Sequence, residues 1–158
     1  MIRGYLLDTN HVGAFVRRDK DLVSRLKSLP LGSIVHVSVI TLGETEAGHW
    51  MSETTNWEKR EEYLRVVRNE LRPNRLDVTA NTASFYGELL GRIWSKNPPA
   101  SAKVRTDDHL VSLGLDINHV WIAAQSIEHN LRLVTADNMA CIKDAADGML
   151  SDSEKWIA

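Results

Sequence analysis

Short apolar runs alternate with amphipathic stretches along most of the chain. The runs 5–7, 34–40 and 131–135 favour buried strands, because each is brief and the second is rich in β-branched residues. Residues 76–78 form a weaker strand candidate. Apolar residues also recur at helical spacing, which predicts amphipathic helices over 20–29, 56–71, 82–95 and 117–129.

The connections between these elements carry signals of their own. Pro30 and Gly32 end the first helix. Thr41 is expected to open a further helix directly after the second strand, with Glu44 three residues on in capping-box register. The polar stretch 96–114 is interpreted as a long irregular connection, a type of segment that is frequently functional.

Strands that alternate with helices predict parallel βαβ units, and hence an α/β fold with three layers (α/β/α) around a central parallel sheet. The chain has 158 residues, of which 43% are hydrophobic and 25% charged, values that suit one globular domain over residues 1–158. A domain of this length buries a core without disulfides. The one cysteine, Cys141, excludes an internal disulfide and any zinc site built from several cysteines.

The charge balance narrows the range of partners. The chain has 19 Lys and Arg against 21 Asp and Glu, a net charge of −2, which excludes a strongly basic coat for nucleic acid but leaves room for a local basic patch. The N-terminal residues lack the apolar core of a signal peptide, and no apolar run approaches the ~18 residues of a membrane span. We therefore predict a cytoplasmic protein without membrane contact.

Three acidic residues occupy equivalent places in the predicted sheet. Asp8 follows the first strand, Glu44 lies one short turn beyond the second, and Asp137 follows the last. In parallel sheets, ligands gather at the carboxyl ends of the strands, so these acids are expected to meet at one edge. Clustered carboxylates repel one another unless a cation lies between them, and Mg²⁺ or Mn²⁺ prefers such oxygen ligands. The set suits phosphodiester hydrolysis, although each acid alone is better explained as a turn or cap residue.

Four fragments stand in order along the chain: Leu6–Asn10, Val37–Glu44, Ile122–Ala124 and Leu133–Asp137. They resemble the motifs of PIN-domain nucleases, and among these of VapC-like toxins of type II toxin–antitoxin pairs. The resemblance implies an Mg²⁺- or Mn²⁺-dependent endoribonuclease that acts on RNA, binds an antitoxin protein and forms a homodimer. It also implies that Asp8, Glu44 and Asp137 hold the metal or orient the attacking water. Thr135 would order the last acid, and Asn10 would position the first.

The third motif departs from the family pattern. The family places an aspartate before Trp-Ile-Ala-Ala, whereas this chain has His119 at that position. Histidine is a poor ligand for Mg²⁺ and a tolerable one for Mn²⁺ or softer metals. His119 could bind a softer metal or act as a base or phosphate contact, Asp116 could supply the missing carboxylate, or the site could be weakened. The sequence leaves these three alternatives open.

Several basic groups are candidates for RNA contacts. Those nearest the acidic motif in sequence are Arg17, Arg18, Lys20, Arg25 and Lys27. A row of arginines recurs at three- and four-residue steps: Arg65, Arg68, Arg72 and Arg75. This row could contact successive phosphates of an RNA. A solvent-exposed helix face, on which the arginines pair with Glu61, Glu62 and Glu70, explains it better. Lys103 and Arg105, in the long connection, are a third possibility.

Other residues have a structural explanation beside a functional one. His11, next to the first acid, is expected on a helix surface, although it could touch substrate. Trp50 and Trp57 flank the polar turn 52–55 and could border a groove for an antitoxin peptide or a dimer contact, but packing within a helical hairpin is the simpler explanation.

Two functions are therefore compatible with the sequence. The first is a metal-dependent endoribonuclease of the toxin type, with Asp8, Glu44 and Asp137 as metal ligands and His119 or Asp116 completing the pocket. The second is a catalytically silent PIN domain that binds RNA or a protein partner, which the histidine at position 119 favours. A phosphatase with an aspartyl nucleophile fits poorly, because Asn10 and Val12 stand where its motif needs Asp and Thr.

Overall fold

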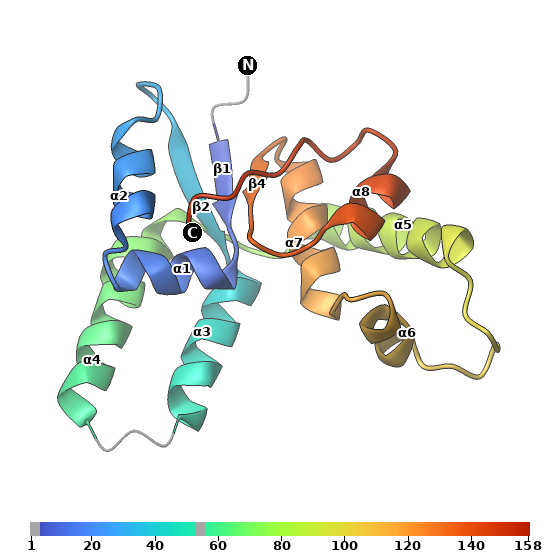
Figure 1. Cartoon of the computed structure of the whole chain (residues 1–158), viewed down its shortest axis with the longest axis horizontal. Helices are drawn as coiled ribbons and strands as arrows, with labels where there is room; N and C mark the ends of the chain where they lie inside the picture. The colour runs from blue at the N-terminus through green and yellow to red at the C-terminus, as the bar shows by residue number, and fades with distance from the viewer. Residues whose placement is uncertain (1–3, 53–55) are drawn as a thin grey trace.

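The computed structural model describes residues 4–52 and 56–158 (Figure 1). Two parts of the sequence interpretation lie outside these ranges: the first three residues of the N-terminal stretch, and residues 53–55 of the turn between Trp50 and Trp57. No helix within the described ranges combines the length and the apolar content that crossing a membrane requires.

Four parallel strands form the sheet at the centre of the fold. They are β1 (Gly4–Leu7), β2 (Ile34–Ser38), β3 (Arg75–Leu76) and β4 (Arg132–Val134), in the spatial order β3-β2-β1-β4. The register places Leu6 of β1 opposite His36 of β2 on one side and Leu133 of β4 on the other. All the pairings are parallel, so the carboxyl ends of the strands share one edge, as the sequence predicts.

Helices connect and cover these strands. Before β3 they are α1 (Thr9–Val16), α2 (Lys20–Lys27), α3 (Val39–Met51), α4 (Trp57–Val66), a π-helical turn (Val67–Leu71) and a 3-10 turn (Arg72–Asn74). After β3 they are α5 (Ala80–Lys96), α6 (Thr106–Ser112), α7 (Ile117–Glu128) and α8 (Ala140–Ala146).

The two faces of the sheet bury separate cores, because successive side chains of a strand point to opposite faces. Leu6 and Leu133 pack with apolar residues of α5, α7 and α8 on one face. Tyr5, Leu7 and Val134 pack with residues of α1, α2 and α3 on the other. Figure 1 shows the corresponding arrangement, with α1 to α4 on one side of the strands and α5 to α8 on the other. The three-layer α/β/α prediction is therefore confirmed.

Several element boundaries differ from the sequence prediction. The second strand ends at Ser38, whose Oγ accepts the backbone N–H of Ile40 (3.0 Å) and caps α3. The β-branched pair Val39-Ile40, which extended the predicted strand, belongs instead to the first turn of this helix. Glu44 thus lies more than one turn inside α3, and the predicted capping box between Thr41 and Glu44 is wrong. The long connection 96–114 contains α6, and α1 and α8 were not predicted.

The C-terminal segment, residues 147–158, follows α8 and comes back to the sheet beside β4. Glu154 forms a parallel bridge with Val134, and its main chain bonds both to Thr135 and to Leu133 (2.9 Å each). Two residues on, Trp156 is buried with its ring centroid 5.0 Å from that of Tyr5. This return places the end of the chain beside α1, as Figure 1 shows.

Candidate active site

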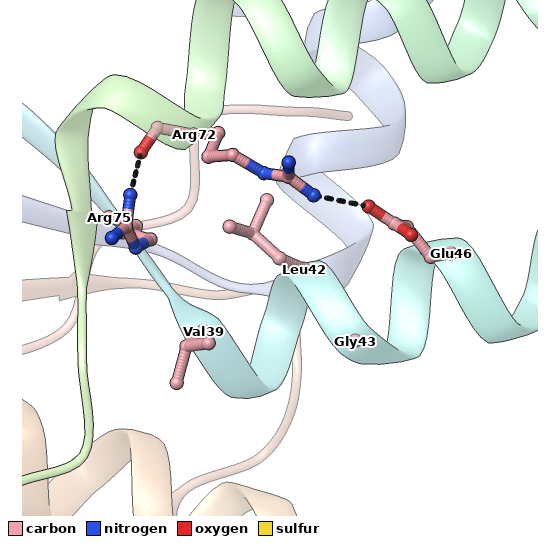
Figure 2. A pocket seen from close by; sticks show the side chains of 6 residues that line it. All are labelled: Val39, Leu42, Gly43, Glu46, Arg72 and Arg75. Carbon is pink, nitrogen blue, oxygen red and sulfur yellow. Dashed lines mark hydrogen bonds and ion pairs between the residues drawn. The ribbon is translucent and has the colours of Figure 1, made fainter.

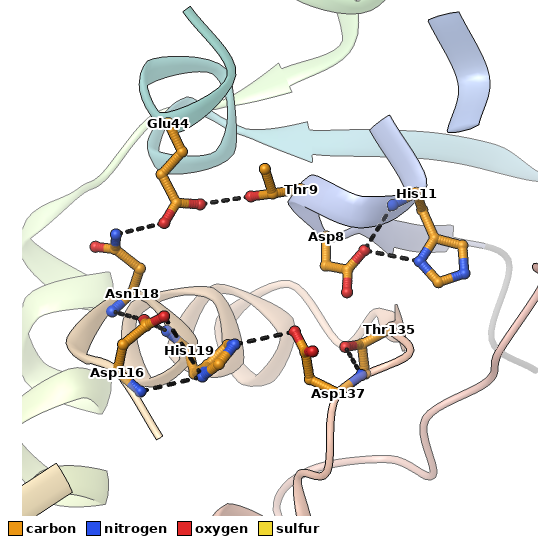
Figure 3. A network of polar contacts seen from close by, with 9 residues as sticks. All are labelled: Asp8, Thr9, His11, Glu44, Asp116, Asn118, His119, Thr135 and Asp137. Carbon is orange, nitrogen blue, oxygen red and sulfur yellow. Dashed lines mark hydrogen bonds and ion pairs between the residues drawn. The ribbon is translucent and has the colours of Figure 1, made fainter. Parts of the chain in front are cut away.

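One cavity at the carboxyl ends of the strands collects almost every residue that the sequence singles out. It has a volume of about 230 Å³, and its walls come from β1, α1, α3, α7 and the loop after β4. Of the predicted site residues only Thr135 lies outside its lining, which comprises Asp8, Thr9, Asn10, Glu44, Asp116, Asn118, His119, Ile122 and Asp137. Figure 3 shows how most of these side chains point toward one another.

Asp8 is the most deeply held of the acids. It follows β1, its N–H bonds to the carbonyl of Val134 (3.0 Å), and its side chain is only 6% exposed. Oδ1 caps α1 by accepting the backbone N–H of His11 (2.9 Å), and it also contacts the Nδ1 atom of the same residue (2.7 Å). Oδ2 is buried and has no hydrogen-bond partner among the described residues.

The surroundings of Asp8 favour its charged form. Burial raises the pKa of a carboxyl group, but the interactions of Asp8 with the ring and the backbone of His11 and with the side chain of Thr135 together outweigh this effect and lower the pKa of Asp8 below its ordinary value. The site therefore contains an ionised carboxylate with one oxygen fully engaged and the other without a partner.

His11 is fully buried, and the prediction of a surface histidine is wrong. The first turn of α1 lies under the C-terminal segment, and the backbone N–H of Trp156 donates to Nε2 of His11 (3.1 Å). The two residues are 145 positions apart in sequence, so no local pattern could have revealed this contact.

Glu44 is clamped from two sides of the cavity. Its Oε2 accepts the hydroxyl of Thr9 (2.5 Å) and its Oε1 accepts the amide of Asn118 (2.6 Å). Thr9 starts α1 and Asn118 lies in the first turn of α7, so this carboxylate ties together three helices. The sequence interpretation assigned no role to Thr9 or Asn118, although both stand next to predicted site residues.

The N-terminus of α7 forms the opposite wall of the cavity. Asp116 caps this helix, and its Oδ1 accepts the backbone N–H groups of Asn118 (2.8 Å) and His119 (3.0 Å). In return, Nδ1 of His119 accepts the N–H of Asp116 (3.2 Å), and Nε2 lies 3.1 Å from Oδ2 of Asp137. The main-chain N–H of Asp137 donates to the hydroxyl of Thr135 (3.0 Å).

These contacts define what His119 can do in this arrangement. Since Nδ1 accepts a backbone N–H, the ring proton of the neutral imidazole lies on Nε2 and is donated to Asp137. Neither nitrogen then offers a lone pair to a metal ion. The imidazole acts here as a hydrogen-bond donor to Asp137, and Asp116 contributes one carboxylate oxygen, Oδ2, that is not bonded to the helix terminus.

The donor set suits a hard cation better than a soft one, because the carboxylates of Asp8, Glu44 and Asp137 present oxygen. The unpartnered Oδ2 of Asp8 fits such an ion. However, among residues 4–52 and 56–158 no three His, Cys, Asp or Glu side chains lie in positions that would hold a metal together. The expected acids therefore share one cavity without converging on a single point.

The basic residues proposed for RNA contacts lie outside this cavity, whose lining contains no Lys or Arg. Arg18 pairs with Glu70 (2.7 Å) and Arg25 with Glu154 (2.8 Å). The arginine row is a paired surface: Arg65 binds Glu62 (2.7 Å), Arg72 binds Glu46 (3.1 Å) and Arg75 binds Asp77 (3.0 Å). Two of these three partners differ from the acids that the sequence suggested.

A larger hollow, of about 530 Å³, lies between α3 and the segment that leads into β3 (Figure 2). Its lining combines apolar residues of α3, including Val39 and Leu42, with Arg72 and Arg75. Figure 2 shows the guanidinium of Arg72 directed at Glu46, so its charge is already compensated. This hollow contains none of the predicted catalytic groups, and all of these except Thr135 line the smaller cavity.

Trp50 and Trp57 are explained by a contact within the chain. The guanidinium of Arg60 lies 5.0 Å from the ring centroid of Trp50 and 4.7 Å from that of Trp57. It also donates to the carbonyl of His49 (2.6 Å), near the end of α3. This agrees with packing between α3 and α4, although both indoles are more than half exposed.

Comparison with known families and structures agrees with this fold. The sequence profile of the PIN domain matches residues 5–147. The chain belongs to the PIN domain family. The matched range includes every residue of the cavity, and the departure at His119 therefore lies inside the family's own domain.

Solved structures with the same fold span nearly the whole of this PIN domain. VapBC2 from Rickettsia felis, bound to a DNA fragment from its promoter, has 23% identity and a TM-score of 0.69 over 97% of this chain and 98% of its own. FitAcB from Neisseria gonorrhoeae has 20% identity and a TM-score of 0.64 over 96% of each chain. VapBC-5 from Mycobacterium tuberculosis, of the VapBC family of toxin–antitoxin systems, has 24% identity and a TM-score of 0.56 over 99% of each. Comparison with curated protein sequences produced no match.

Proposed function

We propose that this PIN domain is a metal-dependent endoribonuclease and the toxin of a type II toxin–antitoxin pair. The observation that carries the proposal is the placement of Asp8, Glu44 and Asp137 around one cavity at the carboxyl ends of the strands. The solved structures that share the fold include VapBC complexes of toxin–antitoxin systems, which supports an antitoxin protein as the partner. A homodimer in the cytoplasm is the assembly that we expect.

Asp8, Glu44 and Asp137 are the residues that would hold Mg²⁺ or Mn²⁺. When bound, the metal would supply a water of lowered pKa and would stabilise negative charge on the phosphate. Hydrogen bonds from His11 keep Asp8 charged and oriented. Asn10, exposed at the rim of the cavity, would position the RNA backbone, and Thr135 orients the main chain of Asp137.

The test is a cleavage time course on a structured RNA with Mg²⁺, with Mn²⁺ and with a chelator. Wild-type protein is expected to cut only with a metal. Asp8→Asn should lose about 10²- to 10⁴-fold in rate, the equivalent of several kcal/mol of charge stabilisation in the transition state. Asparagine caps a helix as well as aspartate does, so this variant should still fold. Cleavage that persists in the chelator, or in Asp8→Asn, would reject the proposal.

A catalytically silent PIN domain that binds RNA or a protein partner is the second candidate. His119 favours this candidate. Both ring nitrogens of His119 form hydrogen bonds, and Nε2 contacts the carboxylate of Asp137. If this candidate is correct, wild-type protein binds RNA without cutting it. His119→Asp would then release Asp137, add a carboxylate and switch cleavage on.

The matched control for this candidate is His119→Asn, which also removes the contact to Asp137 but adds no charge. Activity in His119→Asp alone would assign the silence of the wild type to the missing carboxylate. Activity in both variants would show that the wild type is silent because His119 forms a hydrogen bond with Asp137. Activity in wild-type protein at the level of His119→Asp would exclude the silent function.

A further inference from the structure

A chain of hydrogen bonds leads from the C-terminal segment to the first acid of the cavity. The backbone N–H of Trp156 donates to Nε2 of His11 (3.1 Å), and Nδ1 of His11 lies 2.7 Å from Oδ1 of Asp8. The His11 side chain is fully buried and that of Asp8 is 6% exposed, so water does not compete for these contacts. His11 lines no part of the cavity itself.

The direction of each hydrogen bond fixes the protonation pattern of the ring. A backbone N–H can only donate, so Nε2 of His11 must accept and the ring proton lies on Nδ1. Nδ1–H then donates to Oδ1 of Asp8. In the opposite tautomer, the ring hydrogen on Nε2 would point at the backbone N–H of Trp156. The lone pair of Nδ1 would then face Oδ1 of Asp8. One main-chain group near the end of the chain thus selects the ring state that binds Asp8.

We propose that His11 and the backbone N–H of Trp156 are positioning groups of the active site, which hold Oδ1 of Asp8 so that Oδ2 remains available to the cavity. The inference rests on the proposed function in one respect, that Asp8 is a metal ligand. Residues that orient a ligand from behind typically contribute 10- to 100-fold to metal affinity or activity.

The C-terminal segment is held firmly enough to serve this purpose. Glu154 pairs with Arg132 (2.6 Å) and Arg25 (2.8 Å), and it also accepts the indole N–H of Trp156 (2.7 Å). Its main chain bridges to β4, and the Trp156 ring packs on Tyr5 of β1. The backbone N–H of Trp156 is therefore anchored to β1 and β4, the two strands whose ends carry Asp8 and Asp137.

The first test is the tautomer of His11, measured by long-range ¹H–¹⁵N NMR correlation on the ¹⁵N-labelled full chain at pH 7.5. The His11 signals are assigned by their loss in His11→Leu. We expect the Nδ1–H tautomer, which is the minor form of free histidine in water. An Nε2–H or doubly protonated ring would overturn the proposal. This readout needs neither RNA nor metal, so it remains decisive if the nuclease proposal fails.

A matched pair of variants isolates the main-chain donor. Trp156→Ala loses the indole but keeps the backbone N–H, whereas Trp156→Pro loses both. We expect Trp156→Ala to keep the Nδ1–H signature of His11 and Trp156→Pro to lose it, with both proteins still folded by thermal melting. Identical His11 signals in the two variants would overturn the role of Trp156. If Trp156→Pro does not fold, loss of the Nδ1–H signature in Trp156→Ala would overturn that role as well.

The functional readout is Mn²⁺ affinity, measured by electron paramagnetic resonance, together with kcat and KM for RNA. His11→Leu fills the space without hydrogen bonding, and we expect Mn²⁺ affinity and kcat to fall about 10- to 100-fold while KM stays near its wild-type value. Unchanged Mn²⁺ affinity in His11→Leu would reject the positioning role. If wild-type protein binds no Mn²⁺ and cuts no RNA, the nuclease proposal fails. The NMR result alone then decides whether the hydrogen bonds from Trp156 through His11 to Asp8 exist.

Discussion

An aspartate–histidine pair supports each of two walls of the cavity, and the two pairs differ in how they are held. On the β1 side, the Asp8 side chain is 6% exposed and that of His11 is fully buried, and the contact with Trp156 ties both to the C-terminal segment. On the α7 side, the exposed fractions are 21% for His119, 38% for Asp137 and 53% for Asp116. An aspartate–histidine pair thus occurs twice, once inside the protein and once at its surface.

This difference separates structural from chemical roles. Hydrogen bonds in the buried pair cannot be replaced by water, so breaking one leaves an unsatisfied polar group and costs stability. The exposed pair can exchange its partners for solvent, or for an ion, at small cost. We therefore expect substitutions on the β1 side to lower both stability and activity, and substitutions on the α7 side to affect activity more than stability.

The largest stability effect is expected for Asp8→Ala. This change removes the N-cap of α1 and leaves the ring N–H of His11 buried without an acceptor. Together these losses should lower the free energy of unfolding by about 2–4 kcal/mol in a urea titration. Asp8→Asn keeps an acceptor oxygen and is the control, with an expected loss below about 1 kcal/mol. Equal losses in both variants would mean that the charge, and not the hydrogen bonds, holds this wall.

A smaller effect is expected from Glu154, which lines no part of the cavity but anchors the C-terminal segment that contacts His11. Burial raises the pKa of Glu154, but hydrogen bonds from Arg132, Trp156 and Arg25 outweigh it and bring the pKa to about 2, from an ordinary value of 4.5. Because the folded-state pKa is lowered, the stabilisation is fully present above about pH 4.5 and is lost as the pH falls toward 2. Urea titrations at neutral and acid pH should show this loss.

Glu154→Gln isolates the contribution of this carboxylate. At neutral pH the variant should be less stable than wild type by about 1–2 kcal/mol, since hydrogen bonds to charged groups are among the stronger ones. The gap between the two proteins should narrow as the pH falls from 4.5 toward 2, where the wild-type carboxylate is itself protonated. A gap that stays constant over this range would show that the anchor of the C-terminal segment does not depend on its charge.

On the exposed wall, Asp116→Ala should have a moderate effect. The side chain caps α7 through two backbone N–H groups, and N-cap aspartates contribute about 1 kcal/mol. Asp116→Ser keeps a capping oxygen and should recover most of the stability while it still removes the carboxylate. The comparison of the two variants in urea and in RNA cleavage tests whether Asp116 serves the helix or the chemistry. Activity lost in Asp116→Ser would favour a chemical role.

The same contrast explains which features could be predicted from sequence. The strands are short apolar runs, the helix 117–129 has a periodic apolar pattern, and Asp8 and Asp137 come shortly after strands. Local sequence could therefore predict that these acids lie at one edge of the sheet. Helix α1 was missed because it is short and carries Gly13 and His11 where an apolar stripe would be expected. The burial of His11 depends on Trp156, and the occupation of Asp137 depends on the rotamer of His119. Such contacts between distant segments leave no local signal.

The smallest stability effect is expected for Asp137→Asn. The carboxylate is 38% exposed and lies 3.1 Å from Nε2 of His119, and exposed pairs typically contribute about 0.2–1 kcal/mol. The main-chain contact with Thr135 does not involve the substituted group and should persist. Mn²⁺ affinity should nevertheless fall roughly 10-fold, because one charged ligand is lost. If Asp137→Asn instead destabilises the fold as much as Asp8→Ala does, both walls are equally rigid, and the expectation that the α7 side affects activity more than stability fails.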